Sequence, residues 1–283
     1  MALAQAGEVA ARLKELGLDS ELVPMTTSGD RGAPPSTSWA GVKGLFVAEI
    51  VRALQAGEVD LAVHSAKDLP SEDPNDVVVA AVPERASPLD VLVSREPSLP
   101  AGATVGSSSV RRRGQLLRTR PYKVVDVRGN VDTRLRKMRE RQVDGLVLAA
   151  AGLARLGVAT AYVETMSPDE VMPAPGQGAL AVQARADTAA RELAARLDHR
   201  PSRLAFEAER ALVRQLGGGC ALPLGALGSM VDGGVHLVAV VFRPDGTGYV
   251  RAEGSADAPE TVAREVGDLL RAQGAGRILE ELK

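Results

Sequence analysis

The feature that most constrains the fold is a pattern of short apolar runs alternating with helical stretches, and this pattern occurs twice. Residues 58–63 (EVDLAV) align without gaps with residues 142–147 (QVDGLV), and each run follows a stretch whose apolar residues have helical spacing. Alternation of strands and helices is typical of parallel sheets covered by helices. The sequence therefore predicts two similar α/β halves that face one another across a cleft.

The elements expected in these halves follow from apolar periodicity and from turn residues. In the first half they are a helix over 3–16, a strand over 21–25, a mobile loop over 28–42, a helix marked by Phe46, Ile50 and Leu54 that ends at Gly57, and a buried strand over 59–64. In the second half they are strands over 104–106, 123–127 and 145–148 and helices over 110–118 and 131–141.

The last third of the chain follows a different pattern. After Pro201 we expect a helix through about Gln215 and strands near 225–230, 235–243 and 248–255. The sequences DGG at 232–234 and PDG at 244–246 are typical of hairpin turns, and helical patterns follow at 259–272 and 275–282. Because 283 residues are too many for one small core, this segment is predicted to be a third, α+β domain with an antiparallel sheet.

Composition argues against several classes of protein. The chain has one cysteine and three histidines, so no internal disulfide can form and no metal site is expected. It has no apolar run of about 18 residues and does not begin like a secretory signal, which predicts a soluble cytoplasmic protein with no membrane partner. Aromatic residues make up 2% of the chain and the net charge is −2, so no nucleic-acid partner is expected.

The single cysteine, Cys220, follows three glycines at 217–219. Glycines allow backbone conformations that other residues avoid and leave the sulfur uncrowded, so a thiolate here could attach a bulky group. The alternative is a buried cysteine that packs as a small apolar side chain.

Polar residues gather after the apolar strand of the first half, in His64-Ser65-Ala66-Lys67-Asp68-Leu69-Pro70. Ligands of open α/β sheets bind beyond the carboxyl ends of parallel strands, so this segment is a candidate site. The corresponding residues 148–152 of the second half are apolar or glycine, so the architecture does not require the polarity. The alternative is a turn in which Asp68 caps a helix and pairs with Lys67.

Basic residues are concentrated over 106–141, which hold twelve Lys or Arg against three Asp or Glu. Serines 107–109 precede Arg111, Arg112 and Arg113 at an expected helix start, where hydroxyls, free N–H groups and guanidinium groups suit carboxylates or phosphates. Arg128, Arg134 and Arg155 extend the set, whereas Arg136, Arg139 and Arg141 are read as solvated helix positions. An anionic ligand is therefore expected.

A segment rich in proline and glycine, residues 173–179 (PAPGQGA), is a candidate hinge or crossing between the halves. A plain surface turn is the alternative. Neither periodicity nor composition distinguishes the two.

Six segments in this order resemble the porphobilinogen deaminase family, from about residue 1 to the C-terminus. They are Lys43-Gly44-Leu45-Phe46, Val63-His64-Ser65-Ala66-Lys67-Asp68-Leu69-Pro70, Gly106-Ser107-Ser108-Ser109-Val110-Arg111-Arg112, Arg128-Gly129-Asn130-Val131, Pro175-Gly176-Gln177-Gly178-Ala179 and Gly218-Gly219-Cys220. The resemblance implies two periplasmic-binding-protein-like α/β domains, over 1–83 plus about 179–198 and over 84–178, followed by an α+β domain over 199–283 that carries Cys220.

The resemblance also implies a transferase of tetrapyrrole and heme biosynthesis, acting as a monomer. Four porphobilinogen molecules would add stepwise to a dipyrromethane cofactor linked to Cys220, releasing ammonia and the linear tetrapyrrole hydroxymethylbilane. Asp68 matches the family's catalytic carboxylate. The positions that match cofactor-binding residues are Ser65, Lys67, Ser108, Ser109, Arg111, Arg112, Gly129 and Gln177, and those that match residues holding substrate or growing-chain carboxylates are Lys43, Arg128, Arg134 and Arg155.

The sequence departs from the family at its beginning. It lacks the Thr-Arg-x-Ser strand that usually precedes the family's first helix, so we expect the natural start to lie upstream of Met1.

A two-lobed anion-binding or solute-binding protein without catalysis is the main alternative function, because polar strand ends and arginine clusters also suit simple anion capture. Such a protein would need no adduct on Cys220.

Overall fold

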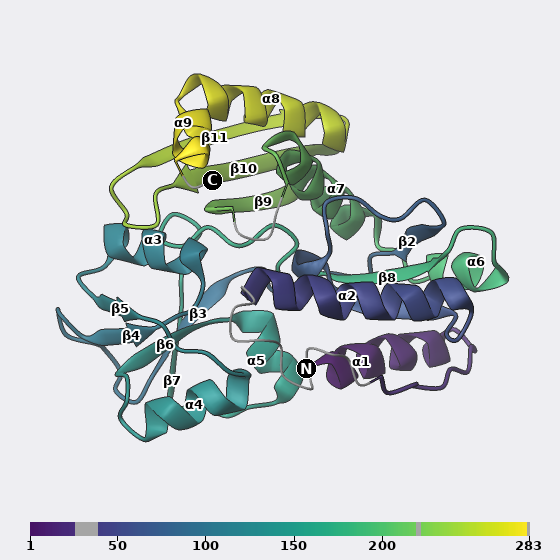
Figure 1. The fold of residues 1–283 in the computed structure, drawn as a ribbon, viewed down its shortest axis with the longest axis horizontal. Helices are drawn as coiled ribbons and strands as arrows, with labels where there is room; N and C mark the ends of the chain where they lie inside the picture. Colours follow the sequence, from purple (N-terminus) through teal and green to yellow (C-terminus); the bar gives the residue numbers. More distant parts are fainter. Residues whose placement is uncertain (26–38, 219–221, 282–283) are drawn as a thin grey trace.

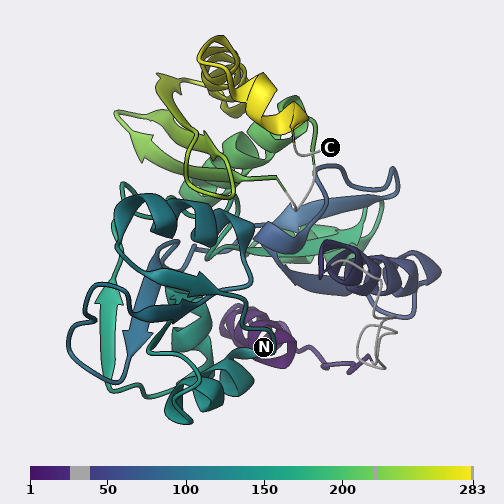
Figure 2. The same ribbon diagram turned by 60° about the vertical axis from the view of Figure 1, so that its left-hand side comes forward.

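The computed structural model describes residues 1–25, 39–218 and 222–281, with 39–46 described by their backbone alone. Three sheets, each with its own helices, form three units that meet near the middle of the molecule (Figures 1 and 2). The first two units are α/β and the third is α+β with an antiparallel sheet, so the expected fold class is confirmed.

The first unit is a three-stranded sheet with helices on both faces. Helix α2 packs on one face through Val51 and Leu54, whereas α1 and α6 pack on the other through Val9, Leu13 and Ala194. The strand order is β1-β8-β2. Its elements are α1 (Ala2–Glu15), α2 (Trp39–Ala56), β1 (Leu61–Ser65), the 3-10 turn η1 (Ala66–Asp68), β2 (Val77–Ala81), β8 (Leu180–Arg185) and α6 (Ala189–Ala195).

Two expectations for this unit are wrong. The sheet is antiparallel, because β8 enters from the second unit and runs between β1 and β2 in the opposite direction. Residues 21–25 are not a strand: Leu22 and Val23 are exposed, and an extended segment becomes a strand only when its backbone groups find partners. Residues 28–38 of the loop expected over 28–42 lie outside the described residues. Residues 39–42 form the beginning of α2 and are not a loop.

The second unit is a five-stranded sheet in the order β5-β4-β6-β3-β7. Its centre is parallel as expected, since β4 runs parallel to both β5 and β6, whereas β3 is antiparallel to its two neighbours. Leu116 of α3 packs on one face, and Leu135 of α4 and Leu153 of α5 pack on the other. Its elements are β3 (Asp90–Ser94), β4 (Thr104–Gly106), α3 (Val110–Thr119), β5 (Lys123–Val125), α4 (Val131–Arg139), β6 (Gly145–Ala149), α5 (Ala150–Leu156) and β7 (Tyr162–Thr165).

The third unit is an antiparallel sheet in the order β11-β10-β9. Helices α7, α8 and α9 cover one face, with Leu212, Val266 and Ile278 in the same apolar cluster. Val240 and Phe242 point from the other face toward Met172 of the second unit. Its elements are α7 (Arg200–Gln215), β9 (Leu224–Val231), β10 (Gly234–Phe242), β11 (Tyr249–Ala256), α8 (Pro259–Ala272) and α9 (Ala275–Glu280).

A buried carboxylate joins the units where the chain crosses between them. Glu209 of α7 is fully buried and pairs with Arg85, on the crossing from β2 to β3, at 2.7 Å. It also accepts hydrogen bonds from the backbone N–H of Gly176, on the return crossing, at 2.5 Å and of Gly228 in β9 at 2.7 Å. One side chain therefore fixes both crossings against the third unit, which defines the walls of the space between the units.

Candidate active site

A cavity of about 740 Å³ lies where the three units meet. The expected site residues that line it are Lys67, Asp68, Ser108, Ser109, Arg111, Arg112, Arg128, Arg134 and Gln177. A smaller hollow of about 480 Å³ over β2 and α6 contains none of the expected site residues in its lining. The structure thus gathers residues from sequence motifs that are far apart in the chain around one cavity.

Asp68 is placed by the end of β1. The strand ends at Ser65, and the single turn η1 then turns the chain so that Lys67 and Asp68 line the cavity. The Ala66 N–H donates to the Ala179 carbonyl at 3.0 Å. A Cβ at Gly176 would lie only 2.8 Å from the Lys67 backbone nitrogen, so this close approach of the two segments requires a glycine. Asp68 is the last residue of η1 and does not precede a helix, so the expected alternative of a helix cap is not what the structure contains.

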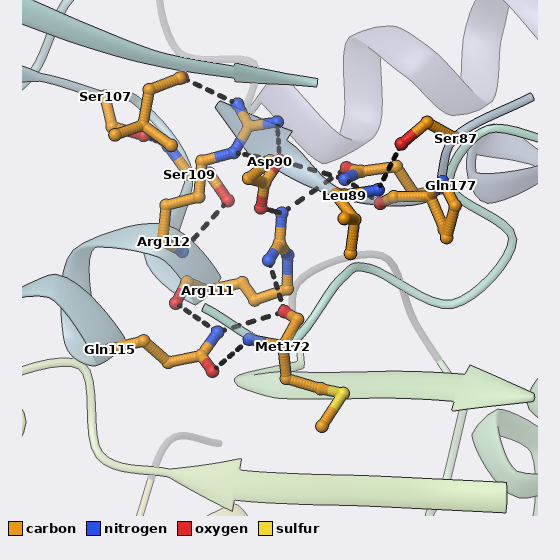
Figure 3. A network of polar contacts seen from close by, with 12 residues as sticks. Ser87, Leu89, Asp90, Ser107, Ser109, Arg111, Arg112, Gln115, Met172 and Gln177 are labelled. Carbon is orange, nitrogen blue, oxygen red and sulfur yellow. Dashed lines mark hydrogen bonds and ion pairs between the residues drawn. The ribbon is translucent and has the colours of Figure 1, made fainter. Parts of the chain in front are cut away.

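The arginines at the start of α3 are held by an acid that the sequence analysis did not anticipate (Figure 3). Asp90, the first residue of β3, is fully buried and pairs with Arg111 Nη2 at 2.6 Å and Arg112 Nη2 at 2.7 Å. It also accepts from Arg112 Nε at 3.1 Å and from Gln177 Nε2 at 2.9 Å. Ser109 caps the helix by accepting from the Arg112 N–H.

These contacts limit what Arg111 and Arg112 can offer a ligand. Arg111 also donates to the Met172 carbonyl, and Arg112 donates through Nη1 to the Val147 carbonyl at 3.1 Å. Both arginines line the cavity but are less than a tenth exposed. Their charge therefore acts on the cavity while much of their hydrogen-bonding capacity is engaged by the protein.

The pKa values indicate how the charges are balanced. Burial alone would raise the pKa of Asp90, but the charges and hydrogen bonds of Arg111 and Arg112 bring it down to about 2. The pKa of Arg134 is lowered, first by burial and then by the charge of Arg112. An anion placed beside Arg134 would offset both the burial of its charge and the repulsion from Arg112.

Arg128 and Arg134 are held less tightly than the α3 arginines. Arg134 donates to the Gly129 carbonyl at 2.7 Å and to Ser108 Oγ at 3.3 Å, and Asn130 caps α4 beneath them by accepting from the Thr133 N–H. Arg128 is 71% exposed and pairs with Asp126, which is 51% exposed. Such an exposed pair contributes little to stability, so Arg128 can exchange its partner for a ligand carboxylate at small cost.

The charges around the cavity leave a positive surplus. Among the described residues that line it, six are Lys or Arg and one, Asp68, is acidic. Three further carboxylates stand behind the arginines, namely Asp73, Asp90 and Asp126. An excess of two positive charges remains on the walls formed by these residues.

Other expected site residues lie elsewhere. Arg155 is outside the cavity lining: it pairs with Glu8 of α1 at 2.8 Å and donates to the Gly178 carbonyl at 3.1 Å. Ser65 and Gly129 are likewise absent from that lining, and Ser65 accepts a 2.6 Å hydrogen bond from Gln5. Cys220 and the Lys43 side chain fall outside the described residues, although Gly218 and Leu222, on either side of Cys220 in the sequence, both line the cavity.

Sequence reasoning missed several charged residues at or behind the site, among them Asp90, Glu209 and Arg210. Asp90 opens an apolar strand, a position that carries no distinctive local signal. Glu209 could have been found, because it lies between Ala205 and Leu212 on the apolar face of α7, where an acid needs a partner. Arg210 lines the cavity from α7, and nothing in its local sequence distinguishes it from a solvated helix arginine.

Neither a membrane-spanning helix nor a metal-binding cluster occurs in the described part of the chain. Across 1–25, 39–218 and 222–281, no helix combines the length and the apolar character needed to cross a bilayer. Within the same ranges, His, Cys, Asp and Glu side chains form no group of three or more that could hold a metal ion.

Comparison with known proteins identifies relatives over the whole chain. The family model described as "Porphobilinogen deaminase, dipyromethane cofactor binding domain" matches residues 1–192, and "Porphobilinogen deaminase, C-terminal domain" matches residues 203–273. A porphobilinogen deaminase of Thermus thermophilus is 46% identical over 100% of this chain and 96% of its own length, and one of Shouchella clausii is 44% identical over 100% and 94%.

Among solved structures, a TRAP periplasmic solute binding protein from Desulfovibrio salexigens is 11% identical and covers 69% of this chain and 67% of its own, with a TM-score of 0.41. A TM-score of that size carries no argument about function. The fold is defined instead by the strand order and pairing within each sheet.

Proposed function

We propose, from the premise that this chain belongs to the porphobilinogen deaminase family, that the cavity between its three units is the site where porphobilinogen is condensed. The chain is a transferase with a dipyrromethane cofactor. The observation that carries the assignment of the site is the single cavity lined by Asp68, by a surplus of guanidinium groups and by the residues on either side of Cys220.

The residues of the cavity fit the cofactor. Each pyrrole of a dipyrromethane carries an acetate and a propionate, so the group is strongly anionic and needs cations and hydrogen-bond donors around it. Arg112 and Arg134 supply positive charge, and Ser108 and Ser109 supply hydroxyls at the start of α3. Phe206 and Leu222 provide apolar surface for the rings. We propose that Cys220 attaches the group through a thioether.

The reaction follows from what these side chains can do. When bound, the dipyrromethane would supply a tethered, nucleophilic pyrrole carbon. Arg128 and Arg134 hold substrate carboxylates, which orients the aminomethyl carbon. As the amino group leaves as ammonia, the carboxylate of Asp68 stabilises the positive charge that develops on the substrate pyrrole. The same carboxylate can accept the proton released when the new carbon–carbon bond forms.

Several finer assignments belong to the same proposal. The domains would comprise 1–83 plus about 179–198, 84–178 and 199–283, which is supported by the position of β8 inside the first sheet. Lys43 and Arg155 would bind carboxylates of the growing chain, and Arg155 would first have to exchange its present partner, Glu8. We further propose a cytoplasmic monomer that binds no nucleic acid.

Intact-protein mass spectrometry tests the proposal. The purified chain should carry the mass of a covalent dipyrromethane, and Cys220→Ser should remove it. Asp68→Asn should keep the adduct and the fold but lower turnover by about 100-fold or more, the usual contribution of a general acid–base group. Asp245→Asn, in an exposed turn of the third unit, is the matched control and should leave turnover unchanged.

Three outcomes would contradict parts of the assignment. An unmodified thiol in material that produces hydroxymethylbilane would exclude attachment at Cys220. Normal turnover of Asp68→Asn would reject Asp68 as the catalytic group, and bound porphobilinogen without turnover in the wild-type chain would favour anion capture alone.

A further inference from the structure

Helix α7 of the third unit forms hydrogen bonds with the segment that follows Asp68. Arg210 donates to the Pro70 carbonyl through Nη2 at 2.8 Å and through Nε at 3.2 Å. It also forms a two-pronged contact with Asp73, from Nη1 to Oδ2 at 2.7 Å and from Nη2 to Oδ1 at 2.9 Å. One turn further along α7, Arg214 donates to the Ser71 carbonyl at 3.3 Å.

We propose that Arg210, together with Asp73, is a positioning residue that sets the place of Asp68 in the cavity. The proposal rests on the proposed function and extends it to residues outside the six segments that carry the family resemblance. Asp68 lies two residues before Pro70 in the sequence, so a shift of the Pro70 carbonyl moves Asp68 directly.

The geometry of the contact requires an arginine. The planar guanidinium reaches a carbonyl and both oxygens of a carboxylate at once, which the single ammonium of a lysine cannot do with the same directions. The Arg210 side chain is only 13% exposed and that of Asp73 only 20%. The Arg210 guanidinium also lies 5.7 Å from the centre of the Phe206 ring, which restricts its movement.

The far side of the contact is anchored in the first sheet. Asp73 also accepts a hydrogen bond from Gln183 Nε2 at 2.7 Å, and Gln183 belongs to β8, between β1 and β2. Residues 66–73 are thus held at one end by the strand that leads into them and at the other by Arg210 and Gln183. The third unit contributes to that hold through α7.

The same helix leads toward Cys220. After α7 ends at Gln215, Gly218 comes so close to the Asp68 segment that a Cβ on it would lie 2.9 Å from Ser71 Oγ. Gly218 and Arg210 both line the cavity. One helix of the third unit therefore contacts the Asp68 segment and leads into Gly218 at the cavity wall.

Arg203 provides a matched control on the same helix. Seven residues before Arg210, it pairs with Asp198 at 2.7 Å and donates to the Ala80 carbonyl at 2.9 Å, so its contacts have the same chemistry. It lies at the smaller hollow over β2 and not at the cavity. Loss of either arginine should lower stability, but only loss of Arg210 should affect the reaction.

The test compares Arg210→Gln, Asp73→Asn, the double variant and Arg203→Gln as holoenzymes whose adduct is checked by mass. For the first two, kcat should fall by about 10–100-fold, the effect of a misplacement of roughly 1 Å, while KM for porphobilinogen changes little. The double variant should lose no more than either single one, because both remove the same contact. Arg203→Gln should keep kcat within about twofold, as a variant of stability alone.

A second readout does not depend on activity. Amide hydrogen exchange of residues 66–73 should accelerate in Arg210→Gln and in the isosteric Asp73→Asn, but not in Arg203→Gln. Equal losses of kcat in Arg203→Gln and Arg210→Gln, or unchanged kcat and exchange in both Arg210→Gln and Asp73→Asn, would overturn the inference. A wild-type chain without adduct or turnover would instead defeat the proposed function, so the two failures are distinguishable.

Discussion

Removing the charge of Asp90 is the sharpest test of how the arginines of α3 are held. The substitution Asp90→Asn keeps the shape of the side chain but leaves Arg111 and Arg112 side by side in a buried environment without an anion between them. It also replaces one of the two carboxylate oxygens, which together accept from Arg111, Arg112 and Gln177, with an amide NH2 that can only donate. The variant therefore removes the negative charge and one acceptor while the side chain keeps its shape.

The size of the effect follows from burial and from the pKa. A folded pKa of about 2 against an ordinary value of 3.8 corresponds to roughly 2 kcal/mol in favour of the charged form. Breaking a buried ion pair by neutralising one partner typically costs about 3–5 kcal/mol, because the other charge stays uncompensated. We expect Asp90→Asn to lower the free energy of unfolding by about 3 kcal/mol.

The pH dependence provides an internal check. A lowered folded pKa gives stability that is present above the unfolded pKa, near 4, and is lost as the pH falls toward 2. The difference between wild type and Asp90→Asn should therefore be constant from about pH 5 to pH 8. A difference that disappears within this range would mean that another group is responsible.

Urea unfolding measures the change, and Asp126→Asn is the matched control. Asp126 also pairs with an arginine, Arg128, but both side chains are more than half exposed, so its loss should cost under about 1 kcal/mol. The fraction of purified Asp90→Asn that carries the dipyrromethane mass should fall as well, since the α3 arginines lose their fixed direction. Equal, small costs for the two variants would refute the role of Asp90 as the buried anchor of these arginines.

Two further predictions concern residues outside the cavity wall. Burial lowers the pKa of His64 from 6.5 to about 4 in the folded chain. Between these pH values the unfolded chain binds a proton at His64 that the folded chain does not bind, so the folded state loses stability as the pH falls from 7 to 5. In urea unfolding, His64→Asn should make this loss smaller by about 2 kcal/mol. A Cβ at Gly114 would lie 2.6 Å from Phe242 Cδ2 and 2.8 Å from the Arg243 carbonyl, so Gly114→Ala should destabilise the contact of α3 with the third unit by about 1–3 kcal/mol. Gly7→Ala, in the open on α1, should instead stabilise by up to about 1 kcal/mol, and similar thermal shifts in both variants would contradict the packing argument.

Elements whose partners are close in sequence could be predicted from the sequence. The three strands of the third unit, Leu224–Val231, Gly234–Phe242 and Tyr249–Ala256, differ from the expected ranges by one residue at each end. A turn that contains glycine joins each strand to the next. The two paired strands are therefore neighbours in the sequence, and the local sequence is enough to predict their pairing.

Pairing between distant segments was beyond the same reasoning. β1 pairs with β8, so that Leu61 lies opposite Ala184. An alternating apolar pattern states that a segment is extended and half-buried, but it does not name the neighbour or the direction. The first sheet was for this reason expected to be parallel, and residues 21–25 were expected to be a strand although no described strand lies beside them.

At the site, the sequence indicated which kinds of side chain would gather but not how their charges are shared. Asp68 and the arginine cluster follow from motifs with a clear chemical purpose. The ion pair of Asp90 with Arg111 in α3 joins the start of β3 to a later helix, and the ion pair of Arg210 with Asp73 joins α7 to the segment after η1. Both are tertiary contacts between residues more than 20 positions apart.

The cavity arginines differ in whether an acidic side chain of the protein already pairs with them. This difference indicates which arginine binds a carboxylate of the growing chain most strongly. Arg111 and Arg112 already have Asp90, whereas the lowered pKa of Arg134 shows that burial and the neighbouring Arg112 disfavour its charge. An anion bound beside Arg134 raises the pKa of this guanidinium, and by linkage the charged guanidinium binds the anion more tightly than the neutral form does. A ligand carboxylate at Arg134 offsets the burial of its charge and the repulsion from Arg112, while one at Arg111 would have to compete with Asp90. We therefore expect that removing the charge of Arg134 weakens chain binding more than removing that of Arg128, which is exposed and already paired.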